Sequence, residues 1–233
     1  MGKRLIQQRR GRGTHTYKSA SHRFQGEVKH YPHESFGQVT DIIHCAGHTA
    51  PLMEVSYTDG EHSLAIAPEG IKVGDQFQIG GMEIKTGHVL PLRQIPEGTL
   101  IHNLELHPGD GGKLVRSSGT FAKIVAKIDD RVQVQLPSRQ EKLFLGECRA
   151  AIGVVAGSGR TEKPFLKAGT RYKKMRARNK LYPHVCGISM NAVDHPFGGK
   201  CSHIKGRPTQ APRSAPPGRK VGKIAPRRTG RKV

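Results

Sequence analysis

The residue types most capable of chemistry lie close together near the C-terminal end, in residues 187–200 (Gly-Ile-Ser-Met-Asn-Ala-Val-Asp-His-Pro-Phe-Gly-Gly-Lys). Asp194 and His195 place a carboxylate beside an imidazole, and Pro196 favours an extended backbone at the residue before it. The glycines at 198–199 allow a sharp turn or a close approach of the main chain to another group. We call residues 187–200 the finger motif, and we predict that it is a rigid loop buried in a polyanion.

General acid–base catalysis is one function that Asp194 and His195 could perform, with the carboxylate orienting the imidazole. Adjacent residues of an extended segment point to opposite sides, however, so they cannot form such a pair directly. Hydrogen bonding of these side chains to RNA backbone or bases is therefore the favoured interpretation.

Two nucleotide- and acyl-transfer motifs are present only in part. Residues 199–202 (Gly-Lys-Cys-Ser) resemble the end of a phosphate-binding loop, but Asp194 stands where an earlier glycine is required and Cys201 replaces Ser or Thr. Residues 157–159 (Gly-Ser-Gly) do not complete the G-x-S-x-G nucleophile elbow. Neither motif predicts an active site, and the sequence predicts no cofactor.

Histidine and cysteine residues form two loose groups with metal-binding side chains. One group is His44, Cys45 and His48, and the other is made up of Cys186, His195, Cys201 and His203. Zinc sites normally combine two paired units such as Cys-x2-Cys and His-x3–5-His. His44 and His48 have the His-x3-His spacing, but neither group contains a Cys-x2-Cys unit. The sequence therefore predicts no metal site, although binding at the first group stays open.

The charge of the chain is divided very unevenly. The net charge is +21 over 233 residues, with +6 in residues 1–36, −3 in residues 37–159 and +18 in residues 160–233. A near-neutral centre with two cationic arms is typical of a protein that binds nucleic acid or an anionic membrane. The arms lack the large apolar face of an interfacial helix, and no apolar run is long enough for a membrane span or signal peptide. The four scattered cysteines suit a reducing cytosol.

RNA is favoured over DNA as the partner, because no helix-turn-helix, zinc finger or basic zipper is visible. Arg and Lys bind phosphate oxygens and release condensed counterions. Interleaved Gly and Pro allow an extended chain to pass between packed RNA helices. A solvated charge run is the alternative for each arm, but 20 Lys and Arg against two acids in residues 160–233 favour nucleic acid.

The central part of the chain predicts two small β-barrels in tandem. Short apolar or alternating runs separated by Gly, Pro and Asp turns are typical of such barrels rather than of helices. Residues 59–60 (Asp-Gly) predict a hairpin, and residues 129–130 (Asp-Asp) predict a turn before a half-buried strand. The expected strands are residues 39–44, 52–57, 63–67 and 75–79 in the first set, and residues 99–106, 114–116, 121–127, 131–136 and 143–155 in the second.

Order is expected to be low in both arms. The N-terminal extension, residues 1–37, has few large apolar residues and should become ordered only on a partner. Residues 172–180 predict one or two helical turns with cations on all faces. Residues 205–233 consist largely of Pro, Gly, Arg and Lys and cannot bury enough surface to fold alone.

Residues 190–199 (Met-Asn-Ala-Val-Asp-His-Pro-Phe-Gly-Gly) closely resemble the signature of the universal large-subunit ribosomal protein L-two family. Residues 215–222, 227–231 and the central stretch 98–112 carry the same likeness, which covers essentially the whole chain. The N-terminus and the Asn191-Ala192 pair are closer to the archaeal or eukaryotic branch than to the bacterial one. One departure is Lys200, which stands where the family signature is expected to have a third glycine.

The resemblance implies a mainly β fold in four parts: a basic N-terminal extension (1–37), an OB-fold RNA-binding domain (38–84), an SH3-like barrel (85–160) and an extended basic tail (161–233). It implies a non-enzymatic constituent of the large ribosomal subunit, in the cytoplasm, whose partners are large-subunit rRNA, neighbouring ribosomal proteins and the small subunit at a bridge. The tail would approach the peptidyl-transferase centre and support tRNA binding, with His195 positioned rather than catalytic.

Residues of the tail are the expected rRNA-binding set, since they are either cations or members of the finger motif. They are Arg171, Lys173, Lys174, Arg176, Arg178, Lys180, Met190, Asn191, Asp194, His195, Gly198, Gly199, Lys200, Arg219, Lys220, Arg227 and Arg228. Two other classes stay as rivals: a zinc-dependent or histidine-based nuclease or hydrolase, which tightly bound metal would reveal, and a DNA-architectural protein, which would prefer duplex DNA.

Overall fold

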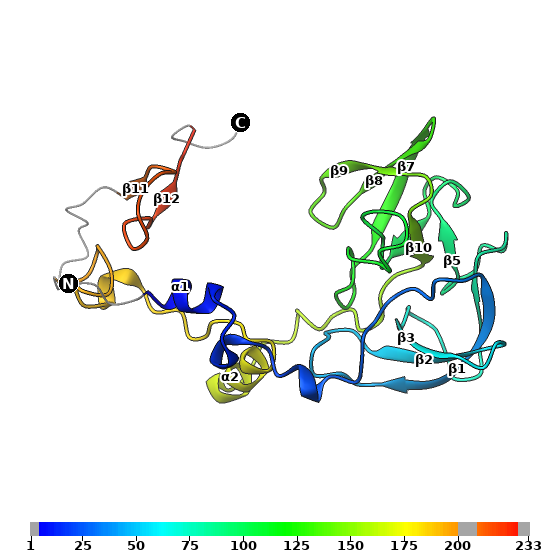
Figure 1. Cartoon of the computed structure of the whole chain (residues 1–233), viewed down its shortest axis with the longest axis horizontal. Coiled ribbons are helices and arrows are strands. Elements are labelled where there is room, and N and C mark those ends of the chain that lie inside the picture. The colour runs from blue at the N-terminus through cyan, green and yellow to red at the C-terminus, as the bar shows by residue number, and fades with distance from the viewer. Residues whose placement is uncertain (1–4, 200–208, 228–233) are drawn as a thin grey trace. The chain divides into compact units, whose positions relative to one another are not determined.

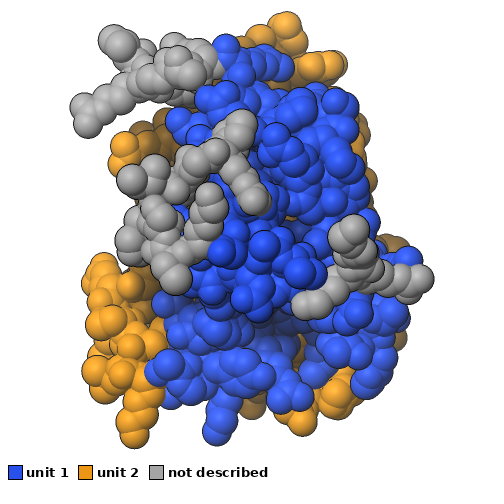
Figure 2. All heavy atoms as spheres, turned by 90° about the vertical axis from the view of Figure 1, so that its left-hand side faces the viewer, with its two compact units in different colours: residues 1–20, 168–233 blue, residues 21–167 orange. Residues whose placement is uncertain are grey.

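The computed structural model describes residues 5–199 and 209–227, and the chain divides into two compact units. The sheet unit spans residues 21–167, and the tail unit combines residues 5–20 with the described residues from 168 onward (Figure 2). The two ends of the sequence therefore contribute to the same unit, while the central part forms the other.

Ten strands make up the sheet unit and join in one hydrogen-bonded sheet (Figure 1). They are β1 (Ser35–Ile43), β2 (Leu52–Tyr57), β3 (His62–Ile66), β4 (Gln76–Ile79), β5 (Val89–Pro91), β6 (Leu100–His102), β7 (Ala122–Ile128), β8 (Arg131–Gln135), β9 (Glu141–Leu145) and β10 (Arg149–Ile152). The strand order is β3-β2-β1-β4-β5-β10-β6-β7-β8-β9, and all pairs are antiparallel except β4–β5. The prediction of a mainly β chain is confirmed, and this order is compatible with two barrels.

Two hydrophobic cores meet at the paired strands β5 and β10. Successive residues of a strand face opposite sides, so Val89 and Ala151 pack into a core with β1, β2 and β4, whereas Leu90 and Ala150 pack into a core with β7 and β8. A third cluster joins the ends of β2 and β3 to Val28 and Val155. The β5–β10 pair is therefore a wall shared by both halves of the unit.

Several strands differ from the sequence-based expectation. β5 was not predicted, because its residues Val89 and Leu90 are buried in cores on opposite faces of the strand. Such a strand does not alternate between apolar and polar residues. The single run expected at 143–155 is two strands, β9 and β10, separated by a turn in which the N–H of Gly146 donates to the carbonyl of Asp130 at 2.7 Å. Residues 114–116 form no strand, since Val115 has a φ of +55° that a β ladder does not allow.

The end of the predicted N-terminal extension is folded into the sheet unit, which corrects the expectation of disorder there. Val28 and His30 are buried. The N–H of His30 donates to the carbonyl of Gly111 at 2.9 Å, and Arg116 Nη2 donates to the carbonyl of Val28 at 2.9 Å. Long-range polar contacts of this kind leave no local signal in a basic, Gly-containing sequence.

Short elements make up the described tail unit, and few of its side chains are buried. The elements of the tail unit are α1 (Ile6–Gly11), the 3-10 turns η1 (His15–Tyr17) and η3 (Gly187–Ser189), α2 (Ala168–Ala177), β11 (Gln210–Ala211) and β12 (Lys223–Ile224). The remaining 3-10 turn, η2 (Ser21–Arg23), belongs to the sheet unit. α2 has no buried residue, as expected from its lack of an apolar stripe. The parallel β11–β12 pair was not predicted, and it is accompanied by burial of Ala211 and Ala215. None of the described helices is long and apolar enough to cross a membrane.

Candidate nucleic-acid interface

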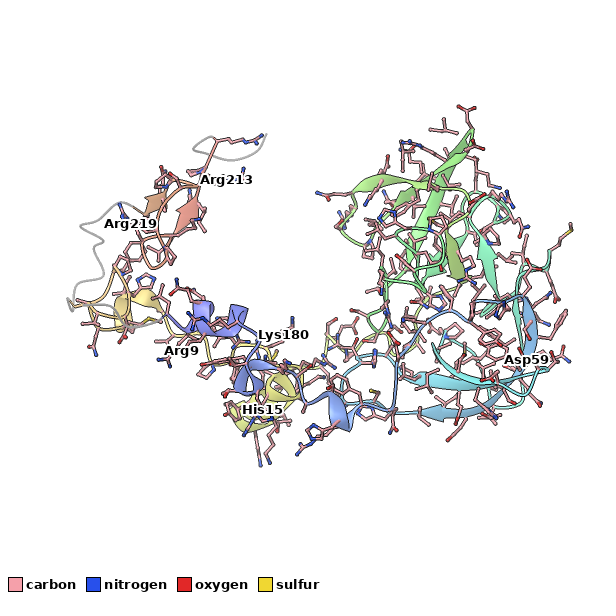
Figure 3. The ribbon with its side chains drawn as sticks, viewed as in Figure 1. Arg9, His15, Asp59, Lys180, Arg213 and Arg219 are labelled. Carbon is pink, nitrogen blue, oxygen red and sulfur yellow. The ribbon has the colours of Figure 1, made fainter. Side chains whose placement is uncertain are left out.

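The surface of the tail unit is cationic and largely solvent-exposed. Asp194 is the one acidic residue in its described sequence. The side chains of Arg9, Lys180 and Arg219 project from its ribbon (Figure 3). The exposed cations of the expected rRNA-binding set are Arg171, Lys173, Arg176, Lys180, Arg219, Lys220 and Arg227. Lys200 and Arg228 lie outside the described residues.

Two cations of the expected set are less accessible than the sequence indicates. Lys174 and Arg178 are only partly exposed, and both contact other groups of the protein. Lys174 lies within α2, and Arg178 directly follows its last residue, Ala177. Asn179 comes next and is in the left-handed region, with a φ of +49°. The N–H of Lys180 closes this end by donating to the carbonyl of Met175 at 2.8 Å.

Arg10 is a structural residue that the sequence analysis missed. Its guanidinium carbon lies 5.8 Å from the centre of the Tyr17 ring, and its Nη2 donates to the main-chain carbonyl of Asn179. Arg10 therefore fastens the N-terminal helix to the end of α2. A second cation–π contact places Arg171 5.1 Å from the centre of the Tyr182 ring. The interleaved tyrosines were the signal in the sequence that could have revealed both contacts.

The finger motif is closed on itself by main-chain hydrogen bonds. The N–H of Gly199 donates to the carbonyl of Met190 at 3.2 Å, which joins the two ends of the loop. The N–H groups of Asp194 and His195 both donate to the carbonyl of Asn191, at 2.9 and 3.1 Å. The prediction of an extended segment at Asp194 is therefore wrong, because residues 191–194 form a turn. Pro196 lies after this turn and does not disrupt it.

Glycine is required in the finger motif by contacts within the loop. A Cβ on Gly198 would overlap the carbonyl oxygen of Met190, and a Cβ on Gly199 would lie 2.8 Å from that of Ala192. Gly199 also has a φ of +92°, which L side chains rarely adopt. The close approach expected of these glycines is thus to the motif's own main chain.

A main-chain N–H group selects one tautomer of the neutral His195 imidazole. The N–H of Phe197 donates to Nδ1 of His195 at 3.0 Å, and a ring nitrogen accepts such a bond only when it carries no proton. In the neutral ring the proton is therefore on Nε2, which becomes a hydrogen-bond donor. His195 is thus suited to acceptors such as phosphate oxygens and base carbonyl groups.

Gly187 provides the space in which the His195 ring lies, so Gly187→Ala should displace the ring. A Cβ at position 187 would overlap the imidazole. We expect the variant to lose the Phe197–His195 hydrogen bond and, with it, the preference for the Nε2–H tautomer. Nitrogen-15 chemical shifts of the imidazole in the full chain measure this preference.

The matched control for this experiment is Gly169→Ala in α2, where a Cβ meets no atom within 4 Å. That variant should leave the His195 nitrogen shifts unchanged. Unchanged shifts in Gly187→Ala as well would show that Gly187 does not position the ring.

The groups of candidate metal ligands do not assemble into a site in the described residues. Cys45 is buried, and its sulfur lies 3.2 Å from Nδ1 of His48 within hydrogen-bonding distance. Among the residues that the structure describes, no three His, Cys, Asp or Glu side chains are grouped as metal ligands. Cys201 and His203 lie outside those residues.

A family model described as "Ribosomal Proteins L2, C-terminal domain" matches residues 85–218, more than half of the chain. The chain is also similar over its full length to proteins named "Large ribosomal subunit protein uL2". It is 52% identical to the protein of Methanothermobacter thermautotrophicus over 240 residues, covering 100% of both chains. It is 51% identical to that of Haloquadratum walsbyi, covering 99% of this chain and 97% of the other, and 50% identical to that of Methanococcus vannielii, covering 100% of both.

Proposed function

Because the chain belongs to the L2 family of large-subunit ribosomal proteins and is a structural constituent of the ribosome rather than an enzyme, we propose that its tail unit binds large-subunit rRNA through phosphate contacts. The finger motif would then position His195 against the RNA. The likeness to the archaeal or eukaryotic branch is confirmed by relatives of archaeal origin.

The observation that carries this proposal is the exposure of cations in and just after α2, a short helix that has no buried residue. Lys173, Arg176 and Lys180 are exposed and make no ion pair among the described residues. Cations displayed in this way gain little from the protein itself, but each can neutralise one phosphate and release its counterion. The tail unit would therefore be ordered mainly by RNA.

The finger motif supports a second part of the proposal, that its members contact RNA directly. A closed loop with exposed Asn191 and Asp194 offers rigid polar groups at low entropic cost. The Nε2–H of His195 would donate to an RNA acceptor. By family resemblance the motif would lie near the peptidyl-transferase centre, and the chain would support tRNA binding and a bridge to the small subunit.

The two halves of the sheet unit support the proposed domain boundaries. An OB fold over residues 38–84 and an SH3-like barrel over residues 85–160 would share the β5–β10 wall. This proposal is supported by the separate cores on the two sides of that wall. The barrels would dock on a specific rRNA shape, while residues 5–20 of the basic extension and the basic tail from residue 168 onward would follow the RNA inward.

A salt titration of rRNA binding tests the role of the exposed cations. The logarithm of the binding constant falls as the logarithm of the salt concentration rises. We expect replacement of Lys173, Arg176 and Lys180 by Ala to make this slope less steep, by roughly 0.7–0.9 for each lost phosphate contact. Binding of the full chain to large-subunit rRNA would be measured in competition with an unrelated structured RNA and with duplex DNA.

The matched control exchanges the same residues for the other cation, as Lys173→Arg, Arg176→Lys and Lys180→Arg. This variant keeps the charge, so it should keep the wild-type slope. An alanine variant with an unchanged slope would contradict phosphate contact at these residues. Equal binding to all three nucleic acids would contradict specific recognition of rRNA.

A further inference from the structure

Among the described residues, strand β9 has a partner strand on only one of its two sides. It is the last strand in the sheet order, and its neighbour on the other side is β8. The opposite end of the sheet differs, because a bridge between Val28 and Leu64 covers part of the β3 edge. β9 is drawn at the margin of its sheet in Figure 1.

The pairing of β8 with β9 determines which main-chain groups are open. The N–H of Leu136 donates to the carbonyl of Gln140, and the N–H of Gly146 donates to the carbonyl of Asp130. Hydrogen-bonded and non-hydrogen-bonded pairs alternate along an antiparallel ladder, so Lys142 and Phe144 bond to β8. The N–H and C=O groups of Glu141 and Leu143, and the N–H of Leu145, therefore point away from the sheet.

The carbonyl of Leu145 is the exception, since it accepts from the N–H of Cys148 at 3.1 Å. An open row of alternating donors and acceptors nevertheless remains over residues 141–145. Such a row is a template for pairing with another extended chain. Natural edge strands usually carry charges or proline to prevent this pairing. β9 carries charges only at its start, Glu141 and Lys142, and has exposed leucines at positions 143 and 145.

The side chains beside this edge form an exposed aliphatic face. Leu143, Leu145 and Ile128 are 46%, 45% and 49% exposed. Cross-strand register places Leu145 opposite Arg131, which in turn is opposite Ile128, so the three lie in one row on one face. Arg131 is exposed between two aliphatic side chains and makes no ion pair among the described residues.

We propose that β9 is the docking edge for an extended segment of a neighbouring protein in the large subunit, which adds a strand to the sheet and covers Leu143 and Leu145. The segment would carry aliphatic side chains on the covered face and a carboxylate for Arg131. This inference rests on the proposed place of the chain in the ribosome, but it concerns a surface separate from the cationic tail.

The chemistry of the edge favours a protein over RNA. A peptide strand supplies donors and acceptors in alternation, which matches the open groups of residues 141–145. Phosphate oxygens only accept, so they would leave the carbonyl groups of Glu141 and Leu143 unpaired. Aliphatic surface gives RNA little gain, whereas another protein buries it against its own apolar side chains.

Amide hydrogen exchange resolved to single residues tests strand addition. In the free chain, the amides of Glu141 and Leu143 should exchange rapidly, whereas those of Lys142 and Phe144 are protected by β8. In purified large subunits that contain the chain, we expect exchange of the first pair to slow by at least about tenfold, which corresponds to about 1.4 kcal/mol of protection. Rapid exchange of these amides in the subunit would overturn the proposal.

A photo-crosslinking amino acid at position 143 distinguishes the partner classes in the same purified subunits. The expected product is a cross-link to an identified segment of another ribosomal protein. A product with rRNA or with a second copy of this chain would overturn the proposal. The failure of rRNA binding by the tail variants is measured separately, so the two proposals fail by different observations.

Two substitutions at exposed positions complete the test. Leu143→Asp should deplete the cross-linked protein from purified subunits, because a buried carboxylate would face its aliphatic side chains. Met82 is 90% exposed and lies outside the strands of the sheet, so Met82→Asp is the matched control and should leave that protein in place. Equal amounts of the protein in both variants would contradict docking on β9.

Discussion

Replacing Glu105 by alanine is expected to lower the free energy of unfolding by about 3–5 kcal/mol, as for other buried ion pairs that lose one partner. Glu105 is fully buried. Its carboxylate accepts from the N–H groups of Gly109, Gly111 and Arg149 at 3.2, 3.1 and 2.9 Å. It also accepts from the Arg149 guanidinium, with Nη2 at 3.0 Å. The variant would leave all of these donors without an acceptor.

Urea unfolding of the full chain, followed by the near-ultraviolet circular dichroism of its tyrosines, measures this loss. Glu27→Ala is the matched control, because Glu27 also forms an ion pair, with 2.8 Å between its Oε1 and the Nζ of Lys29. The side chains of Glu27 and Lys29 are 73% and 49% exposed. Solvent screens such a pair, so the control should unfold at the wild-type urea concentration. If the two variants unfolded at the same urea concentration, the prediction that Glu105 stabilises the sheet unit would be refuted.

The free energy of unfolding of the sheet unit is expected to decrease steeply as the pH falls from 6.5 to 4, because two histidines buried in the folded unit stay neutral over this range. Burial lowers the pKa of His30 to about 4, although its hydrogen bond to the Asn103 carbonyl and the charge of Glu105 oppose the shift. Burial also lowers the pKa of His102 to about 4, against its hydrogen bond to the Gly153 carbonyl. In both rings an N–H donates to the carbonyl, at 2.6 and 3.1 Å.

The direction of the pH effect follows from proton uptake. Unfolded histidines bind protons below about pH 6.5, whereas the folded ones do so only near pH 4. The unfolded state therefore binds more protons across this range, and stability is lost as the pH falls. Each histidine contributes about 1.4 kcal/mol per pH unit, or roughly 3 kcal/mol over the whole interval.

Urea unfolding at several pH values measures the slope. We expect His102→Gln to reduce the slope between pH 6 and pH 4.5 by about 1.4 kcal/mol per pH unit, whatever its effect on stability at neutral pH. His184 is exposed, so His184→Gln should keep the wild-type slope. A His102 variant with an unchanged slope would show that this residue is not the source of the acid sensitivity.

Parts of the fold with a strong local pattern could be predicted from the sequence. The run at 52–57 coincides with β2, and the turns at 59–60 and 129–130 are present, with Gly60 and Asp129 at φ values of +85° and +50°. Each of these depends on alternation or on turn chemistry within a few residues. β5 and the β10 end of 143–155 depend instead on two cores that residues far apart in the sequence complete.

The candidate site shows the same division. The residue types of the finger motif and of α2 were visible, and so was their likeness to a family. The closure of the finger was not, because it depends on where the carbonyl groups of Met190 and Asn191 point. Arg10 was not singled out among the cations of the N-terminal extension, because its partner, Asn179, is far away in the sequence. Identical cations cannot be assigned to RNA or to the protein without knowing their neighbours.

The pairing of the two chain ends in one unit has a consequence for the order of events during synthesis. Residues 21–167 are contiguous, so the sheet unit is complete as soon as that stretch has left the exit tunnel. The N-terminal helix emerges first, yet its partner at Asn179 is among the later residues to be made. The contact of Arg10 with Asn179 can therefore form only after the whole sheet unit has been synthesised, so α1 waits for its partner while residues 21–167 fold.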